Sequence, residues 1–145
     1  CPVYIDHYTQ HRSSVIVKQQ PQGTVYDLFA YEDHDLPSSS LNNGLNYSVV
    51  TGQNQLPIRQ WVHLASTFDG IIQRLYVDGI EVDSDLTEKE LIKQSNGVLR
   101  IGGNSVSGDF FQGYIDEVRI YDRALNDDEI QRDLSTPISS LSLKK

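Results

Sequence analysis

The sequence contains no methionine and only one cysteine. The lone thiol, at Cys1, has no partner within the chain, so a disulfide-stapled fold is excluded. The absence of methionine predicts a chain that is processed or that belongs to a longer polypeptide. No apolar run approaches the roughly 18 residues that span a bilayer, and no signal peptide stands at the start. These absences predict that the chain does not insert into a membrane.

Positive charge is also scarce, because 12 Lys and Arg stand against 20 Asp and Glu, for a net charge of −8. An acidic surface repels phosphate backbones and anionic lipid heads, which excludes nucleic acids and membrane surfaces as general partners. With 145 residues, 38% of them hydrophobic, the chain has the size and composition of one folded domain. We assign this domain to residues 1–135 and a polar tail to residues 136–145.

The dominant local pattern is that of β-strands. Short runs rich in Val, Ile, Tyr and Phe recur between clusters of Gly, Asn, Asp and Pro, which is typical of strands separated by turns. The predicted strands are 14–18, 24–31, 45–50, 61–68, 73–77, 80–83, 98–101 and 113–121. Residues 32–43 lack this pattern and are predicted to form a long exposed loop.

Two Asp-Gly pairs, at 69–70 and 78–79, lie between predicted strands. Such pairs supply the positive φ values of tight hairpin turns, so they predict an antiparallel meander of three strands. Successive side chains alternate across a strand. In the first strand of this meander, alternation therefore predicts that Val62, Leu64 and Phe68 face the core.

One helix is predicted near the carboxyl end. Asn126 followed three residues later by Glu129 is a capping box, in which each side chain satisfies a free backbone N–H of the other residue. The helix is expected over residues 127–134 and ends before Pro137. Many short strands with one terminal helix predict an all-β fold, in which two antiparallel sheets pack as a β-sandwich.

Four segments carry a resemblance to a known family. They are residues 61–70 (WVHLASTFDG), 74–79 (RLYVDG), 99–103 (LRIGG) and 111–125 (FQGYIDEVRIYDRAL). In this order they resemble the laminin G-like domains of the concanavalin A-like lectin/glucanase superfamily. The resemblance implies a jelly-roll sandwich that serves as a non-catalytic binding or adhesion module of secreted or surface proteins. Its expected partners are glycans or extracellular proteins, and its expected location is extracellular.

The resemblance also implies a shortened amino terminus, because family members usually carry more strands before the point where this sequence begins. Residues 3–6 either replace those strands or leave a sheet edge open. Exposed edges pair readily with other strands. The alternative to a binding module is therefore a structural or assembly module, which forms a homodimer by adding or swapping residues 3–6.

Calcium is the one cofactor that the resemblance suggests. Asp116 matches a carboxylate that in related sandwiches often pairs with an amino-terminal loop to hold the ion. A calcium site needs about six to eight oxygen ligands, and that loop is missing here. The alternative is that Asp116 is a carboxylate at a strand edge, and no other cofactor is expected.

Catalysis is a further alternative, because the same fold includes glucanases with a Glu-x-Asp-x-Glu strand. Glu81, Asp83 and Asp85 resemble that motif, and alternation predicts all three on one face of a strand. A retaining glycosidase needs two carboxyl groups about 5 Å apart. The third position carries Asp rather than Glu, and with one Trp the chain has no cluster of Trp residues to stack sugars. The sequence therefore favours a non-enzyme.

Aromatic rings and polar side chains in loops are the usual glycan contacts of such modules. The candidates in this sequence are Tyr31, Asp33 and Asp35 in the predicted long loop, and Asn104 and Asp109 after the Gly-Gly pair. The other tyrosines lie within predicted strands, where their rings are expected to pack.

Overall fold

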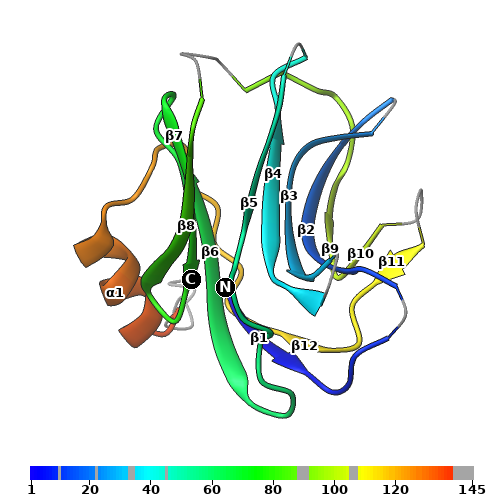
Figure 1. Ribbon diagram of the computed structural model, residues 1–145, viewed down its shortest axis with the longest axis vertical. Helices are drawn as coiled ribbons and strands as arrows, with labels where there is room; N and C mark the ends of the chain where they lie inside the picture. Colours follow the sequence, from blue (N-terminus) through cyan, green and yellow to red (C-terminus); the bar gives the residue numbers. More distant parts are fainter. Residues whose placement is uncertain are drawn as a thin grey trace, which may run out of the picture.

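The computed structural model describes residues 1–9, 11–21, 23–32, 35–44, 46–87, 92–104 and 108–138. Within these residues the chain forms twelve strands and one helix (Figure 1). The strands are β1 (Pro2–Ile5), β2 (Ser13–Gln20), β3 (Gly23–Tyr31), β4 (Ser38–Asn42), β5 (Tyr47–Thr51), β6 (Trp61–Phe68), β7 (Ile72–Val77), β8 (Ile80–Leu86), β9 (Leu99–Ile101), β10 (Gly103–Asn104), β11 (Asp109–Phe110) and β12 (Gly113–Ile115), and the helix is α1 (Asp127–Ser135).

Two five-stranded antiparallel sheets account for most of the described residues. We call them sheet A, with strand order β12-β1-β6-β7-β8, and sheet B, with strand order β5-β4-β3-β2-β9. The sheets stack face to face, as Figure 1 shows, and β10 and β11 form a small separate pair beside β2. The predicted all-β sandwich of two antiparallel sheets is therefore confirmed.

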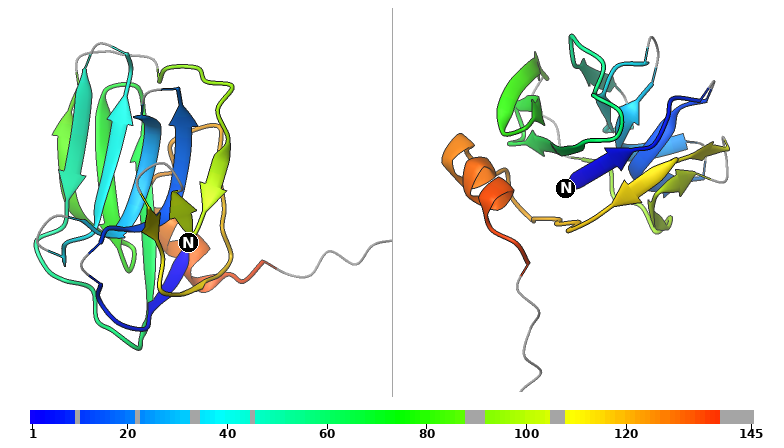
Figure 2. Two further views of the ribbon diagram at one scale, coloured as in Figure 1. Left: turned by 90° about the vertical axis from the view of Figure 1, so that its right-hand side faces the viewer. Right: turned by 90° about the horizontal axis from the view of Figure 1, so that it is seen from below.

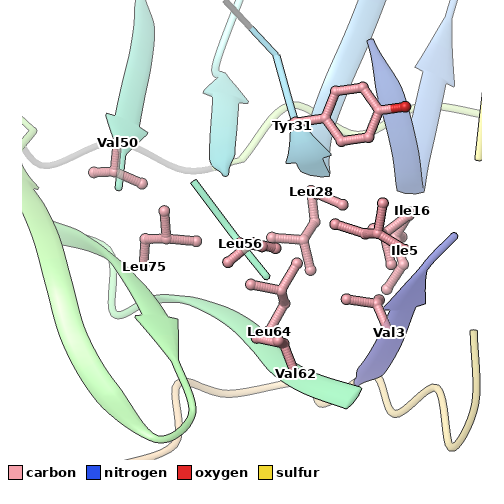
Figure 3. Close-up of a cluster of buried hydrophobic side chains, with 12 residues drawn as sticks. Val3, Ile5, Ile16, Leu28, Tyr31, Val50, Leu56, Val62, Leu64 and Leu75 are labelled. Carbon is pink, nitrogen blue, oxygen red and sulfur yellow. The ribbon is translucent and has the colours of Figure 1, made fainter. Parts of the chain in front are cut away.

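The hydrophobic core lies between the two sheets. Its fully buried side chains come from both layers, with Val3, Leu64 and Leu75 from sheet A facing Leu28 and Val50 from sheet B (Figure 3). Alternation along each strand puts these side chains on the inner face of its sheet. Burial of this apolar surface holds the layers together.

Helix α1 covers the outer face of sheet A (Figure 2). Its predicted capping box is present, since Asn126 accepts a hydrogen bond from the Glu129 backbone N–H and the Glu129 carboxylate accepts one from the Asn126 N–H. Ile130 and Leu125 pack against Tyr76 of β7, whose hydroxyl donates to Asp127 at 3.0 Å. Among the described residues, no helix is long and apolar enough to cross a membrane.

The amino-terminal strand β1 lies inside sheet A. It pairs antiparallel with β6 through Val3↔Val62 and with β12 through Val3↔Ile115. Residues 3–5 thus form a strand that is paired on both sides within sheet A.

The predicted long loop 32–43 is partly wrong, because Ser38–Asn42 forms β4, an inner strand of sheet B between β5 and β3. Three consecutive serines have low strand propensity and no apolar signal, so the pattern alone suggests a loop. Their hydroxyls instead find partners inside the fold: that of Ser39 donates to the Asp27 carbonyl, and that of Ser38 donates to the Glu32 carboxylate at 2.6 Å. Tertiary hydrogen bonds, absent from any local pattern, stabilise this strand.

The last predicted strand, 113–121, is also shorter in the structure, where β12 ends at Ile115. A strand needs a neighbour to pair with, and β12's neighbour β1 begins at Pro2. The face predicted for Val62, Leu64 and Phe68 is the inner one: Val62 and Leu64 are buried, and the half-buried Phe68 stands opposite the buried Gln73. His63, on the opposite face, is buried too.

Gly113 allows the close approach of β12 and β1. It adopts φ 146°, and a Cβ atom there would overlap the carbonyl oxygen of Tyr4. We expect Gly113→Ala to lower the free energy of unfolding by about 2 kcal/mol more than Gly23→Ala, because overpacking adds to backbone strain. Gly23 is the matched control, since its φ is 133° and nothing lies within 4 Å of the point where a Cβ atom would stand. Equal losses in urea unfolding would contradict this account.

Candidate functional site

A groove opens at one rim of the sandwich, between the β4–β5 hairpin and the end of β8. Its cavity volume is about 370 Å³. Eleven described residues line it: Leu41, Asn42, Asn43, Asn46, Tyr47, Ser48, Phe68, Asp85, Leu86, Thr87 and Ile92. Amides, hydroxyls, one carboxylate and one exposed aromatic ring thus meet in a single concave place.

The β4–β5 hairpin forms one wall of the groove. Its turn is held by its own side chains: the Asn42 side-chain oxygen accepts from the Gly44 N–H at 2.8 Å, and that of Asn43 accepts from the Asn46 N–H at 2.6 Å. Gly44 takes φ 97°, which few other residues adopt at low cost. These bonds tie the side chains of Asn42 and Asn43 to the described backbone on either side of the turn.

Tyr47 supplies the aromatic surface. Its side chain is 58% exposed, while its hydroxyl donates to the Ser40 hydroxyl at 2.7 Å. The hydroxyl is thus tethered at one end, while more than half of the residue stays accessible to solvent. Partial burial raises the pKa of Tyr47, so the phenol stays protonated and neutral at physiological pH.

Asp27 anchors this wall from below. Its carboxylate accepts hydrogen bonds from the Ser40 N–H at 2.8 Å, from the Ser40 hydroxyl and from the Thr24 hydroxyl at 3.0 Å. Burial raises the pKa of Asp27 from 3.8 to about 6, an effect that these hydrogen bonds partly offset. A buried carboxyl group therefore supports the tyrosine through Ser40.

Asp85, near the end of β8, forms the opposite wall. The Ser48 hydroxyl lies 2.8 Å from both the Asp85 carboxylate and the Gln73 side-chain oxygen. Gln73 is fully buried and donates to the Ser39 carbonyl at 3.0 Å. A polar chain thus runs from the groove into the space between the sheets.

The expectation that Glu81, Asp83 and Asp85 share one face is wrong. Opposite residues in a sheet share a face, and Asp83 and Asp85 stand opposite the buried residues Leu75 and Gln73. A β-bulge at Val82 shifts the register, which sets Glu81 opposite Tyr76 on the outer face. There Glu81 lies 3.4 Å from the Arg74 guanidinium.

Tyr31 and Asp35, two of the glycan-contact candidates from the predicted loop, do not line this groove. Tyr31 ends β3 and is 1% exposed, its ring packs edge-on against Tyr8, and its hydroxyl accepts from the Thr9 N–H at 3.1 Å. A glycan therefore cannot stack on Tyr31. Asp35 is half-buried and accepts from Gln55 at 3.4 Å. Asp33 lies outside the described residues.

Asn104 and Asp109 stand opposite each other in the β10–β11 pair. Both are buried, at 4% and 6% exposure, and the Asn104 side-chain oxygen accepts from Gln19 at 3.0 Å. One oxygen of Asp109 has no hydrogen-bond partner among the described residues. The structure brings these two candidates together but does not join them to Tyr31 and Asp35.

The sequence did not predict that Tyr47 and Asp85 line the same groove. The turn itself carries a signal, since Asn42-Asn43-Gly44 is typical of a tight hairpin, and Tyr47 follows it. The placement of Asp85 across from that turn has no local signal. It depends on how the sheets stack.

The chain matches the model of the family described as the concanavalin A-like lectin/glucanases superfamily over residues 3–131. It therefore belongs to this superfamily, as the four sequence segments predicted. Among curated proteins it is 32% identical to mouse pappalysin-1 in a 95-residue alignment that covers 59% of this chain and 6% of that protein. The chain thus spans only a small part of this relative's length.

Two solved structures share the fold. Domain 4 of AbnA, an extracellular GH43 arabinanase from Geobacillus stearothermophilus in complex with arabinotriose, has a TM-score of 0.74 at 22% identity, covering 92% of this chain and 63% of that one. A Bacteroides ovatus protein proposed to bind carbohydrate has a TM-score of 0.71 at 17% identity, covering 90% of this chain and 38% of that one. At these identities the likeness establishes the fold alone.

The Asp27 anchor predicts a pH dependence of stability. Because its folded-state pKa is raised, the carboxyl group contributes stability that is complete below pH 3.8 and is lost as the pH rises through about 6. Between these values the wild type should lose about 2–3 kcal/mol more than Asp27→Asn, measured by urea unfolding at each pH. Asp122→Asn, at an exposed position, is the control and should follow the wild type. Parallel curves for wild type and Asp27→Asn would contradict the assignment.

The calcium site that the resemblance implies at Asp116 can be tested by thermal melting. The exposed Asp116 carboxylate accepts from the Glu117 N–H at 2.8 Å, and a Glu117 carboxylate oxygen accepts from the Ile138 N–H at 3.0 Å. Among the described residues, no three His, Cys, Asp or Glu side chains gather as a metal site. We expect the melting temperature to be the same in EDTA and in added calcium, whereas a rise with calcium would establish a site.

Proposed function

We propose that this chain is a non-catalytic carbohydrate-binding module, and that the rim groove is its binding site. The observation that carries the proposal is the exposed ring of Tyr47 beside a concave set of amide, hydroxyl and carboxylate groups. Sugars offer the complementary chemistry, since their C–H faces stack on aromatic rings and their hydroxyls both donate and accept hydrogen bonds. The groove volume is within the range of small-ligand sites, about 300–1,000 Å³.

Each wall has a separate role in this proposal. The Tyr47 ring provides a platform for one sugar face, and its tethered hydroxyl reduces the entropy lost when the ring is ordered. Asp85 accepts hydrogen bonds from sugar hydroxyls, and Asn42 adds an amide on the facing turn. Charged acceptors form stronger hydrogen bonds than neutral ones, so Asp85 is the expected main polar contact.

The net charge of −8 favours a neutral glycan over a sulfated or uronic-acid polymer, because like charges repel. An extracellular location follows from the proposal, since extracellular domain 4 of AbnA, which has this fold, is seen with arabinotriose. A neutral oligosaccharide such as arabinotriose is therefore the first probe to use.

The non-catalytic part of the proposal rests on the bulge in β8. It separates Glu81 from the two aspartates, and Asp83 accepts a hydrogen bond from the Thr51 N–H at 2.8 Å. A retaining hydrolase needs a nucleophile and an acid that face one substrate bond. The face that Asp83 and Asp85 share turns toward β5, where both form hydrogen bonds.

Binding is tested by titration calorimetry with arabinotriose, followed by an array of neutral and sulfated glycans. We expect neutral glycans to bind and Tyr47→Ala to weaken the affinity at least about tenfold, which is about 1.4 kcal/mol. Asp85→Asn should weaken it by a similar factor. Tyr114→Ala is the matched control, because Tyr114 is also exposed, at 66%, but lies on β12.

Three results would overturn the proposal. One is the absence of binding to every glycan on the array. Another is an equal loss of affinity in Tyr47→Ala and Tyr114→Ala, which would place the ligand elsewhere. Cleavage of the oligosaccharide by the purified chain, abolished in Asp85→Asn, would replace a binding module by a hydrolase.

A further inference from the structure

The hydroxyl groups that line the rim groove donate their protons to groups of the protein. Three of the described lining residues carry a hydroxyl, namely Tyr47, Ser48 and Thr87. A hydroxyl has one proton to donate, and its oxygen has two lone pairs that accept. The direction in which each proton points therefore decides whether these groups offer a ligand donors or acceptors.

Tyr47 and Thr87 both donate to acceptors that do not line the groove. The Thr87 hydroxyl donates to the Ile71 carbonyl at 2.9 Å, and a carbonyl can only accept. The Ser40 hydroxyl donates to the Asp27 carboxylate, which is ionised at pH 7. Because the Ser40 proton is used in this way, the 2.7 Å contact between Ser40 and Tyr47 needs the proton of Tyr47. Toward the groove, both lining oxygens therefore offer lone pairs.

Ser48 stands between two acceptors and has one proton for both. Its oxygen lies 2.8 Å from a carboxylate oxygen of Asp85 and 2.8 Å from the side-chain oxygen of Gln73. The side-chain nitrogen of Gln73 donates to the Ser39 carbonyl at 3.0 Å. Turning the amide over would set two oxygens against each other at that place. The Gln73 oxygen is thus held toward Ser48, where it needs a donor.

Burial decides which of the two acceptors receives the Ser48 proton. Gln73 is fully buried, whereas Asp85 is exposed. Among the described residues, Ser48 is the only side chain that donates to the Gln73 oxygen. A buried acceptor without a donor is costly, while water can reach an exposed carboxylate. The Ser48 proton therefore goes to Gln73, and the oxygens of Ser48 and Asp85 face each other with no proton between them.

We propose that Ser48 and Asp85 form a donor-selecting subsite of the rim groove, which binds two neighbouring free hydroxyls of one sugar ring. One ligand hydroxyl donates to the Asp85 carboxylate and the next donates to the Ser48 oxygen, so each facing oxygen receives a proton. This subsite rests on the proposed function, because it specifies which part of a glycan the groove recognises. Gln73 acts through Ser48, whose proton it holds away from the ligand.

A subsite that only accepts hydrogen bonds discriminates between glycans. A carboxylate or sulfate group has no proton to donate, and the charge of Asp85 repels it. A methyl ether or an ester at either hydroxyl also removes a donor. The buried amide of Gln73 thereby selects glycans whose neighbouring hydroxyls are unsubstituted.

The missing proton can be tested without any ligand. Asp85→Asn places an amide N–H beside the Ser48 oxygen and supplies the absent donor, so we expect it to raise the melting temperature. Asp122→Asn, at another exposed position, is the control for the loss of one negative charge. The rise beyond this control should vanish when Asp85→Asn is combined with Ser48→Ala, because the oxygen that lacked a donor is then gone.

The ligand side is tested by titration calorimetry with arabinotriose and with derivatives in which one hydroxyl at a time is replaced by fluorine. Fluorine is close to a hydroxyl in size but does not donate. We expect at least one derivative to bind the wild type at least about tenfold more weakly than arabinotriose. The same replacement should have a smaller effect in Asp85→Asn, because the acceptor for that hydroxyl is altered.

The proposal fails on either of two results. An equal rise in melting temperature for Asp85→Asn with and without Ser48→Ala would show that no proton is missing between these residues. Undiminished affinity for every fluorinated derivative would show that the ligand does not donate at this place. If no glycan binds while the coupling between Ser48 and Asp85 is still measured, the donor shortage is supported and the proposed function alone is overturned.

Discussion

The pairing of β1 between β6 and β12 is the constraint on which the rest of the structure depends. It joins two residues far apart in the sequence, Val3 and Ile115, in adjacent strands of one sheet. It also brings the side chains of Val3 and Ile5 into the core, where they are almost fully buried. Without this short strand, sheet A would divide between β6 and β12, and the core would open to water. Four residues therefore complete a layer that is otherwise formed by distant segments.

The two cavities of this sandwich are lined by different kinds of side chain. The rim groove is bounded by a hairpin turn and the end of β8, and its walls carry polar groups and one aromatic ring. The second cavity, of about 380 Å³, lies beside residues 65–68 of β6, and apolar side chains such as Ile16, Leu28 and Leu41 are among those that line it. A ligand rich in hydroxyls suits the rim groove.

Much of the fold could be predicted because its signals are local. The capping box at Asn126, the Asp-Gly turns and the alternation in β6 each depend on residues close together in the sequence. The serines of β4 could not be placed in this way, because their hydroxyls bond to Asp27, Glu32 and Ser66 on other parts of the chain. Of the candidate site, the Asn-rich turn before Tyr47 was visible in the sequence, but its partner across the groove was not.

The sequence by itself determined the class of fold, the meander of β6, β7 and β8, and the family, because hydrophobic alternation, turn residues and capping residues act over a few positions. Only the tertiary structure decided which polar residues meet. The bulge at Val82 turns Glu81 away from Asp83, and the stacking of the two sheets sets Asp85 beside Ser48. Such contacts join residues many positions apart, so their geometry is fixed by strand register and packing rather than by any local pattern.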